Sequence, residues 1–106
     1  MTPNYTFDQT KRYVSRGIHD TFSIELQLKL WKLIDDLKAK NHTLDYLQVF
    51  ELKVNNQELT ITHKQEVPAY HQTHQFKTSG VPEGSTYKIF VIDDVTHSTM
   101  ILASEY

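Results

Sequence analysis

The stretch "SIELQLKLWKLIDDLKAK", Ser23 to Lys40, decides the fold class of this chain. Its first half alternates apolar and polar residues as a strand does. However, leucine, lysine, glutamate and glutamine dominate the stretch, β-branched residues are scarce, and its length exceeds that of an average strand. With Thr21 or Ser23 as N-cap and lysines in the last turn, it predicts a helix over about Ser23–Ala39.

The predicted helix has an unusually broad apolar surface. At about 100° per residue, one stripe that would face a sheet consists of Leu26, Leu30, Leu33, Ile34 and Leu37. Ile24, Leu28 and Trp31 form a second lobe, more than a quarter-turn from the first. This lobe belongs either to the core or to a surface for a partner.

Apolar runs and turn residues predict the strands. The expected strands cover Arg12–Ile18, Tyr46–Val54, Glu58–Gln65, Tyr87–Asp93 and Ser98–Tyr106, and Asn55-Asn56 is expected to form the turn of a hairpin. The order β-α-β-β-β-β with short connections predicts an α+β domain, in which one main helix packs on a mainly antiparallel sheet of four to five strands. Residues 1–10 are expected to be a flexible arm.

Three predicted strands are apolar on both faces, which one helix cannot cover. Ile89–Ile92 and Met100–Ala103 are apolar throughout, and Tyr46–Leu52 comes close. Three arrangements would cover the second face: the long segment 67–85 folds over it, the sheet curls around its own side chains, or two copies associate. Segment 67–85 is expected to be a loop that is functional, covers something or hides a short element.

Composition bounds the class of function. The chain has 106 residues, a formal net charge of -2 and no cysteine. One domain is expected, with no zinc–thiolate site, no disulfide and no overall positive charge to attract nucleic acid. The N-terminus lacks the apolar region of a secretory signal, and no apolar run is long enough to cross a bilayer. We therefore expect a cytoplasmic protein that binds neither membrane nor nucleic acid.

Six histidines invite a metal hypothesis. The compact pair is His71-x-x-His74, and His63 could supply a third imidazole. This spacing is a weak signal, far short of a zinc-protease motif, and solvated histidines in a loop are the better explanation. No catalytic residue and no cofactor are predicted, since no phosphate-binding loop or nucleophile motif is present.

Arg12 and Arg16 are the only arginines. At strand spacing they would point to the same face, and a guanidinium suits carboxylate or phosphate recognition. Ion pairs within the chain are the competing interpretation.

Several phrases together resemble a known family: "RYVSRGI", "ELQLKLWKLIDDLK", "DYLQVFEL", "THKQEVPAY" and "KIFVIDDVTHSTMILASEY". From about Tyr13 to Tyr106 the chain resembles small proteins of unknown function from staphylococci, streptococci and related low-GC Gram-positive bacteria. The resemblance implies a bacterial cytosolic protein, and it brings no activity, substrate or cofactor.

Two functional hypotheses follow. The first is a non-catalytic binding or regulatory module that associates with a protein partner or with itself. Trp and Arg are common interface hot spots, and the residues expected to make this interface are Arg12, Arg16, Ile24, Leu28 and Trp31. The alternative is a small ligand- or metal-binding domain or enzyme with a site around 67–85, built from His63, Glu66, Tyr70, His71, His74, Asp93 or His97.

Overall fold

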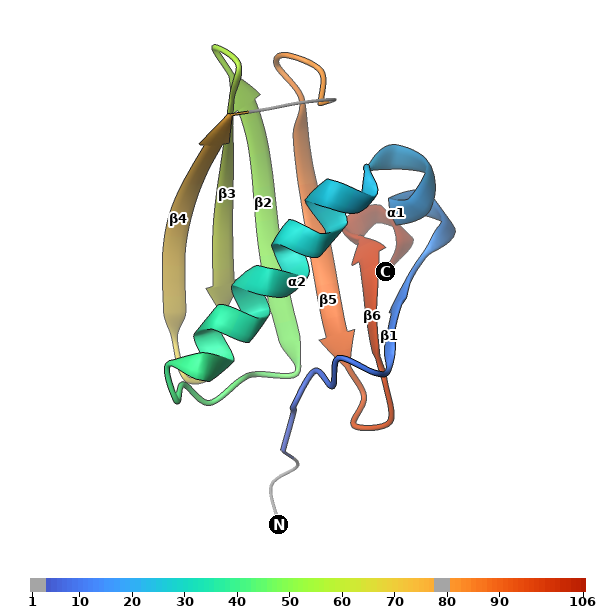
Figure 1. Ribbon diagram of the computed structural model, residues 1–106, viewed down its shortest axis with the longest axis vertical. Coiled ribbons are helices and arrows are strands. Elements are labelled where there is room, and N and C mark those ends of the chain that lie inside the picture. Colours follow the sequence, from blue (N-terminus) through green and yellow to red (C-terminus); the bar gives the residue numbers. More distant parts are fainter. Residues whose placement is uncertain (1–3, 78–80) are drawn as a thin grey trace.

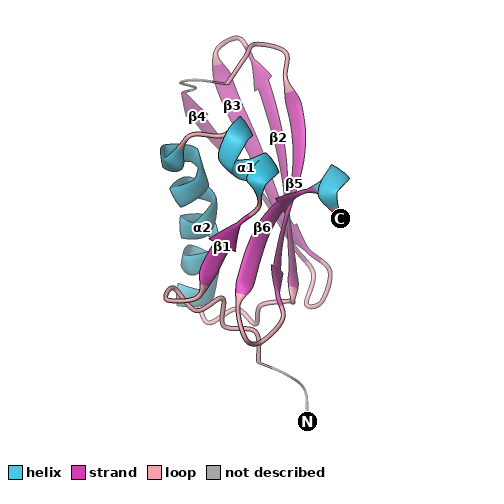
Figure 2. Cartoon of the chain, turned by 90° about the vertical axis from the view of Figure 1, so that its right-hand side faces the viewer, coloured by secondary structure: helices cyan, strands magenta, loops and turns pink. Residues whose placement is uncertain are grey.

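The computed structural model describes residues 4–77 and 81–106, and its main feature is a six-stranded mixed sheet with a long helix on one face (Figures 1 and 2). The elements in chain order are β1 (Arg12–Val14), α1 (Arg16–Thr21), α2 (Ile24–Ala39), β2 (Leu47–Asn55), β3 (Glu58–Gln65), β4 (Tyr70–Lys77), β5 (Thr86–Asp93), β6 (Ser98–Leu102) and a 3-10 turn, η1 (Ala103–Glu105). The strand order is β1-β6-β5-β2-β3-β4. β1 runs parallel to β6, and the other neighbours are antiparallel. The α+β class is confirmed.

Helix α2 is the element that the sequence predicts best. The Ser23 side chain accepts a hydrogen bond from the Leu26 amide at 3.2 Å, which is the N-cap arrangement expected from the sequence. Glu25 lies in the first turn and Lys38 in the last, where each charge suits the helix dipole. The predicted stripe is buried in full: Leu26, Leu30, Leu33, Ile34 and Leu37.

The N-cap makes a first testable contribution to stability. Ser23→Ala is expected to lower the free energy of unfolding by about 1 kcal/mol, because the Leu26 amide loses its acceptor. Urea denaturation followed by circular dichroism measures this change. Ser104→Ala, at an exposed position, is the control and should leave the midpoint unchanged. Equal effects of the two changes would contradict the assignment of the cap.

The predicted strand Arg12–Ile18 is wrong in its second half. β1 ends at Val14, and helix α1 starts at Arg16, so Arg12 and Arg16 do not share a strand face. Ser15 ends the strand because its hydroxyl accepts from the Ile18 amide at 3.2 Å and caps α1. A β-carbon at position 17 would lie 2.7 Å from the Glu105 carboxylate, so a larger residue here would displace that carboxylate from the Gly17 amide.

Of the three alternatives for segment 67–85, the one that the structure shows is a hidden element. The segment contains β4, which pairs with β3 over eight residues and extends the sheet sideways instead of folding over it. The sheet therefore has six strands where four to five were expected. The strand escaped detection because "YHQTHQFK" has almost no apolar alternation. Residues 78–80, including Gly80, lie outside the described residues.

The C-terminal strand is shorter than predicted. β6 ends at Leu102, and the chain turns into η1 because the Glu105 carboxylate accepts the Leu102 amide at 2.8 Å and the Ser15 hydroxyl at 2.6 Å. The β2–β3 hairpin also turns one residue later than expected. Its two-residue loop is Asn56-Gln57, with φ of 53° and 62°, as tight hairpins require.

The expected flexible arm is held to the core at Phe7. This side chain is 1% exposed. Its amide donates to the Asp93 carboxylate at 2.9 Å, and its carbonyl accepts from the Arg12 guanidinium. The arm was expected to be flexible because its sequence is polar. Burial of the Phe7 side chain nevertheless fixes this segment to the core. Residues 1–3 lie outside the described residues.

Candidate functional site

The candidate functional site lies on the face of the sheet turned away from α2, called here the outer face. Figure 2 shows α2 along one face, while only the short turn η1 lies on the other side. The burial pattern agrees: alternate residues of β2 and β3 that face α2 are buried, and their neighbours on the outer face are half-buried or exposed. Among the described residues, no helix covers the outer face.

An apolar strip crosses the outer face over three strands. Its members are Leu47, Val49, Phe90, Ile92 and Ile101, all half-buried. They are neighbours across the sheet, since Val49 pairs with Phe90 and Phe90 pairs with Ile101. The Tyr106 ring meets Phe90 edge-on at 5.6 Å between centroids and covers one end. The five residues Leu47, Val49, Phe90, Ile92 and Ile101 are called the outer strip. They confirm the prediction from the sequence that these strands are apolar on both faces.

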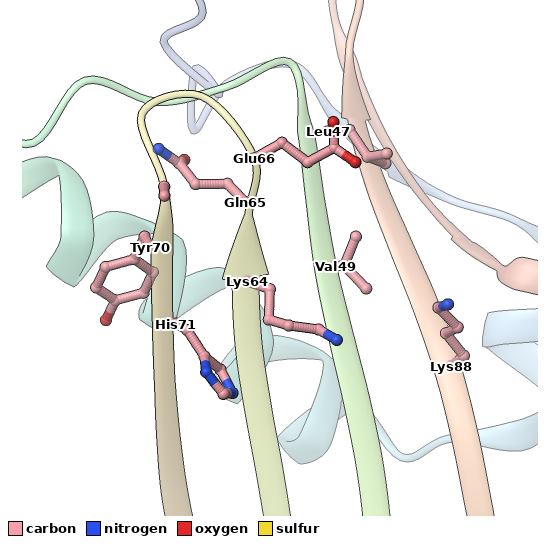
Figure 3. A pocket seen from close by; sticks show the side chains of 9 residues that line it. Leu47, Val49, Lys64, Gln65, Glu66, Tyr70, His71 and Lys88 are labelled. Carbon is pink, nitrogen blue, oxygen red and sulfur yellow. The ribbon is translucent and has the colours of Figure 1, made fainter.

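A groove of about 590 Å³ begins at Leu47 and Val49 and continues toward β4 (Figure 3). The side chains around it are Lys64, Gln65, Glu66, Ala69, Tyr70, His71 and Lys88. A second groove of about 580 Å³ adjoins it at Lys88 and includes Glu51 and the threonines of β3. A hollow of this size with an apolar floor and charged walls is typical of binding sites.

The charges of the groove are centred on Glu51. Its carboxylate lies 2.8 Å from the Lys64 ammonium, and this hydrogen bond, with Lys88 and His71 nearby, lowers the pKa of Glu51. Glu51 therefore stays ionised and is neutralised by Lys64. Lys88 forms no ion pair within the described residues, so its ammonium is available beside the outer strip, in a groove that Glu66 also lines.

The outer face is basic although the chain is acidic. Its strand positions carry four lysines, Lys53, Lys64, Lys77 and Lys88, and two glutamates, Glu51 and Glu58. With Glu66, which lines the groove, the formal charge of these residues is +1, whereas the whole chain has -2. A charge separation of this kind favours an acidic binding partner.

The opposite, inner face contains a buried polar cluster around His63. Gln48 donates to the Asp45 carbonyl at 2.9 Å and to the Gln65 side chain at 2.7 Å, so its own carbonyl oxygen accepts from His63 Nε2 at 2.7 Å. Nδ1 of His63 consequently carries no proton and has no partner among the described residues. Burial, aided by nearby His74, lowers the pKa of His63 to about 3. His63 is therefore a neutral core residue.

The three histidines proposed as metal ligands do not converge. His63 and His74 lie on the inner face, whereas His71 lies on the outer face, because residues three apart on a strand point to opposite sides. Within the described residues, no group of three or more histidine, cysteine, aspartate or glutamate side chains could hold a metal ion.

The other residues of the alternative site are also dispersed. Asp93 is buried and accepts from the Phe7 and Val95 amides. His97 contacts Asp94 in the exposed β5–β6 turn. Glu66 and Tyr70 line the groove together with His71, and they are the only members of the predicted set that the structure brings together there.

The five predicted interface residues have different environments. Arg12 forms a two-bond ion pair with Asp35, and its guanidinium lies 4.7 Å from the ring centroid of Trp31, which is 7% exposed. Arg16 is exposed and lies 3.9 Å from Asp20. Ile24 and Leu28 are more than 60% exposed on α2. Their role in an interface stays a prediction.

Sequence reasoning did not select Lys64, Lys88 or Phe90 as site residues. The signal that was available is the run of both-face apolar strands, which identified an uncovered face but not the charges beside it. Lys64 and Glu51 are 13 positions apart in sequence and meet only because Glu51 pairs with Thr62 in the β2–β3 hairpin. The register of the β2–β3 hairpin therefore brings these two side chains together, and the sequence alone does not show it.

The fold and the open face together define a small α+β protein with one helix-covered and one uncovered sheet face. The chain belongs to the family described as "Staphylococcal protein of unknown function (DUF960)", which matches residues 11–105. It is also similar to a solved structure described as a protein of unknown function from Enterococcus faecalis, at 30% identity and a TM-score of 0.75, over 100% of this chain and 98% of that one. None of the curated proteins matches the chain. The resemblance to a family from low-GC Gram-positive bacteria is thus confirmed.

Neither α1 nor α2 is long and apolar enough to span a membrane, and the described residues contain no other α-helix.

Proposed function

We propose that the protein is a non-catalytic binding module whose outer face receives an extended, acidic segment of a partner protein. The observation that carries this proposal is the outer strip, five half-buried apolar residues that lie next to Lys88, which has no ion-pair partner in 4–77 or 81–106. An extended segment alternates its side chains, so apolar residues would contact the strip while acidic residues reach Lys64 and Lys88. Such a surface would act in the cytoplasm by binding and not by chemistry.

A peptide pair tests this proposal directly. A short peptide of alternating leucine and glutamate is expected to shift the amide resonances of Val49, Phe90 and Ile101 in an NMR titration. A matched peptide of leucine and lysine should not, since the outer face is positive. Equal shifts with both peptides, or shifts confined to α2, would contradict the proposal.

Variants of the outer face sharpen the same experiment. Phe90→Ala is expected to weaken binding of the acidic peptide at least about tenfold, because it removes the central apolar contact. Lys88→Gln should weaken binding about fivefold. Lys40→Gln removes an exposed lysine just after α2 and is the matched control, with no expected effect. Leu28→Ser tests whether the exposed residues of α2 contribute.

The second candidate function is binding of a small amphipathic carboxylate. The groove volume of about 590 Å³ favours it, since small-molecule sites have this size. A medium-chain fatty acid is a suitable probe. If it displaces the acidic peptide and binds more tightly, the ligand is a small molecule; if it does neither, the ligand is a polypeptide.

A further inference from the structure

β4 presents an open backbone edge. It is the last strand of the sheet, and Figure 1 shows no described element beyond it. Its pairing with β3 is continuous from Tyr70 to Lys77, without a bulge. The amide and carbonyl groups that point away from β3 therefore form an eight-residue edge without a backbone partner among the described residues.

This edge lacks the features that normally prevent strands from pairing between molecules. Natural edge strands are commonly short, bulged, or interrupted by proline or an inward-pointing charge. β4 contains no proline and no acidic residue, and its one lysine, Lys77, lies at the very end. β1, the opposite edge, has only three residues. Of the two edges of the sheet, only β4 is long and unprotected. This difference indicates that β4 pairs with another strand in the functional state of the protein.

Symmetry restricts how two copies of β4 can pair. In an antiparallel pair, opposite residues point to the same face of the sheet. When two identical strands pair in this way and extend one sheet, a twofold axis passes between them. At that axis one residue lies opposite the same residue of the other copy. The position of the axis determines how many residues of β4 are paired. Seven of the eight residues are paired when the axis lies at Thr73 or at His74, and fewer are paired at any other position.

With Thr73 at the axis, the strand is complementary to itself. Tyr70 would lie opposite the partner's Phe76 on the inner face, an aromatic pair of the kind that stabilises sheets. His71 would lie opposite the partner's Gln75 on the outer face, and the two copies of Thr73 would meet at the centre. No like charges oppose each other.

With His74 at the axis, the pairs are poorer. His71 would face the partner's Lys77, which places like charges together whenever the imidazole is protonated. Gln72 would face the partner's Phe76, and two His74 rings would meet on the inner face. The comparison selects the register centred on Thr73.

We propose that two copies of this chain associate through β4, antiparallel and centred on Thr73, and join their sheets into one twelve-stranded sheet. Both outer faces then lie on the same side of the combined sheet, so the dimer presents two copies of the outer strip to the same partner. The self-complementarity of β4 favours a second copy over a foreign peptide. This inference does not depend on the proposed function, because its readouts are mass and cross-linking and not peptide binding.

A single cysteine tests the register. The chain has no cysteine, so Thr73→Cys places one thiol at the axis, where antiparallel partners have an α-carbon separation within disulfide range. Mild oxidation is expected to convert most of this variant into a covalent dimer. Gln72→Cys is the control, since that side chain lies on the other face and opposite the partner's His74. Equal cross-linking of the two variants, or none with Thr73→Cys, would overturn the proposal.

Charge complementation tests the association itself. In sedimentation experiments at high micromolar concentration, the unmodified protein is expected to have twice the monomer mass. Thr73→Lys and Thr73→Glu should each raise the dissociation constant at least tenfold, because like charges meet at the axis, and an equal mixture of the two should recover the dimer. Thr62→Lys is the control: Thr62 is the neighbour of Thr73 on the interior strand β3, and the change should not alter the mass. A monomeric unmodified protein, or a mixture that fails to recover the dimer, would overturn the proposal.

Discussion

Phe50→Ala is expected to lower the free energy of unfolding by about 4 kcal/mol, which is a large part of the stability of a small protein. Phe50 is fully buried on β2, and its ring stacks on the imidazole of His63 with 4.5 Å between centroids. Removing the ring leaves a cavity at the centre of the core, where the stiff sheet cannot collapse to fill it. Urea denaturation monitored by circular dichroism measures the loss.

Phe90→Ala is the matched comparison, because it makes the same chemical change on the other face of the neighbouring strand. Phe90 is half-buried, and its pairing partner Val49 belongs to the outer strip. We expect a loss of about 1 to 2 kcal/mol, in proportion to the smaller area removed from water. An equally large loss at both positions would mean that the outer face is fully covered in solution, and the proposed binding surface would then be wrong.

The stability of the protein is expected to fall as the pH falls from 7 to 5, by about 2 kcal/mol through His63 alone. The pKa of His63 is about 3 in the folded protein, below the ordinary value of 6.5 in the unfolded chain. Between these two values the unfolded state binds more protons than the folded state, so acid favours unfolding. Well above pH 6.5 both states are neutral at this residue, and stability no longer depends on its titration.

The measurement is the free energy of unfolding at pH 7, 6 and 5, in the unmodified protein and in His63→Gln. The glutamine amide can still donate to Gln48, and it does not titrate. The difference between the two proteins should therefore shrink toward low pH by the amount assigned to His63. Glu51, whose pKa is lowered from an ordinary value of 4.5, affects stability only at lower pH. A difference that is constant from pH 7 to 5 would show that His63 is accessible to protons in the folded state.

Local signals were sufficient to predict the helix, its cap and the buried stripe. Ser23, the good helix formers and the apolar spacing all act within a few residues of one another, so the sequence displays them directly. β4 was missed for the opposite reason. In "YHQTHQFK" only Tyr70 and Phe76 pack against the core and the side chains between them are polar, so the pairing of the strand is determined by β3 and not by its own composition.

The candidate site was only half predictable. Apolar residues on both faces of β2, β5 and β6 indicated a face without cover, and the structure has such a face. The position of Trp31 could not be predicted, since a large apolar residue on a helix indicates core and interface equally. Only the fold places Trp31 beneath Arg12, whose own charge is paired with Asp35.

The parallel pairing of β1 with β6 has a consequence for how the protein acquires its structure during synthesis. The ribosome delivers β1 early, yet its partner follows only after the whole α2 and β2–β5 region has emerged; the hydrogen bond between Phe7 and Asp93 spans 86 positions. The hairpins β2–β3 and β3–β4 can form meanwhile, since their contacts are local. β1 and the Phe7 segment cannot complete their pairing before β5 and β6 have been synthesised, so this edge of the sheet closes only after translation has passed β6.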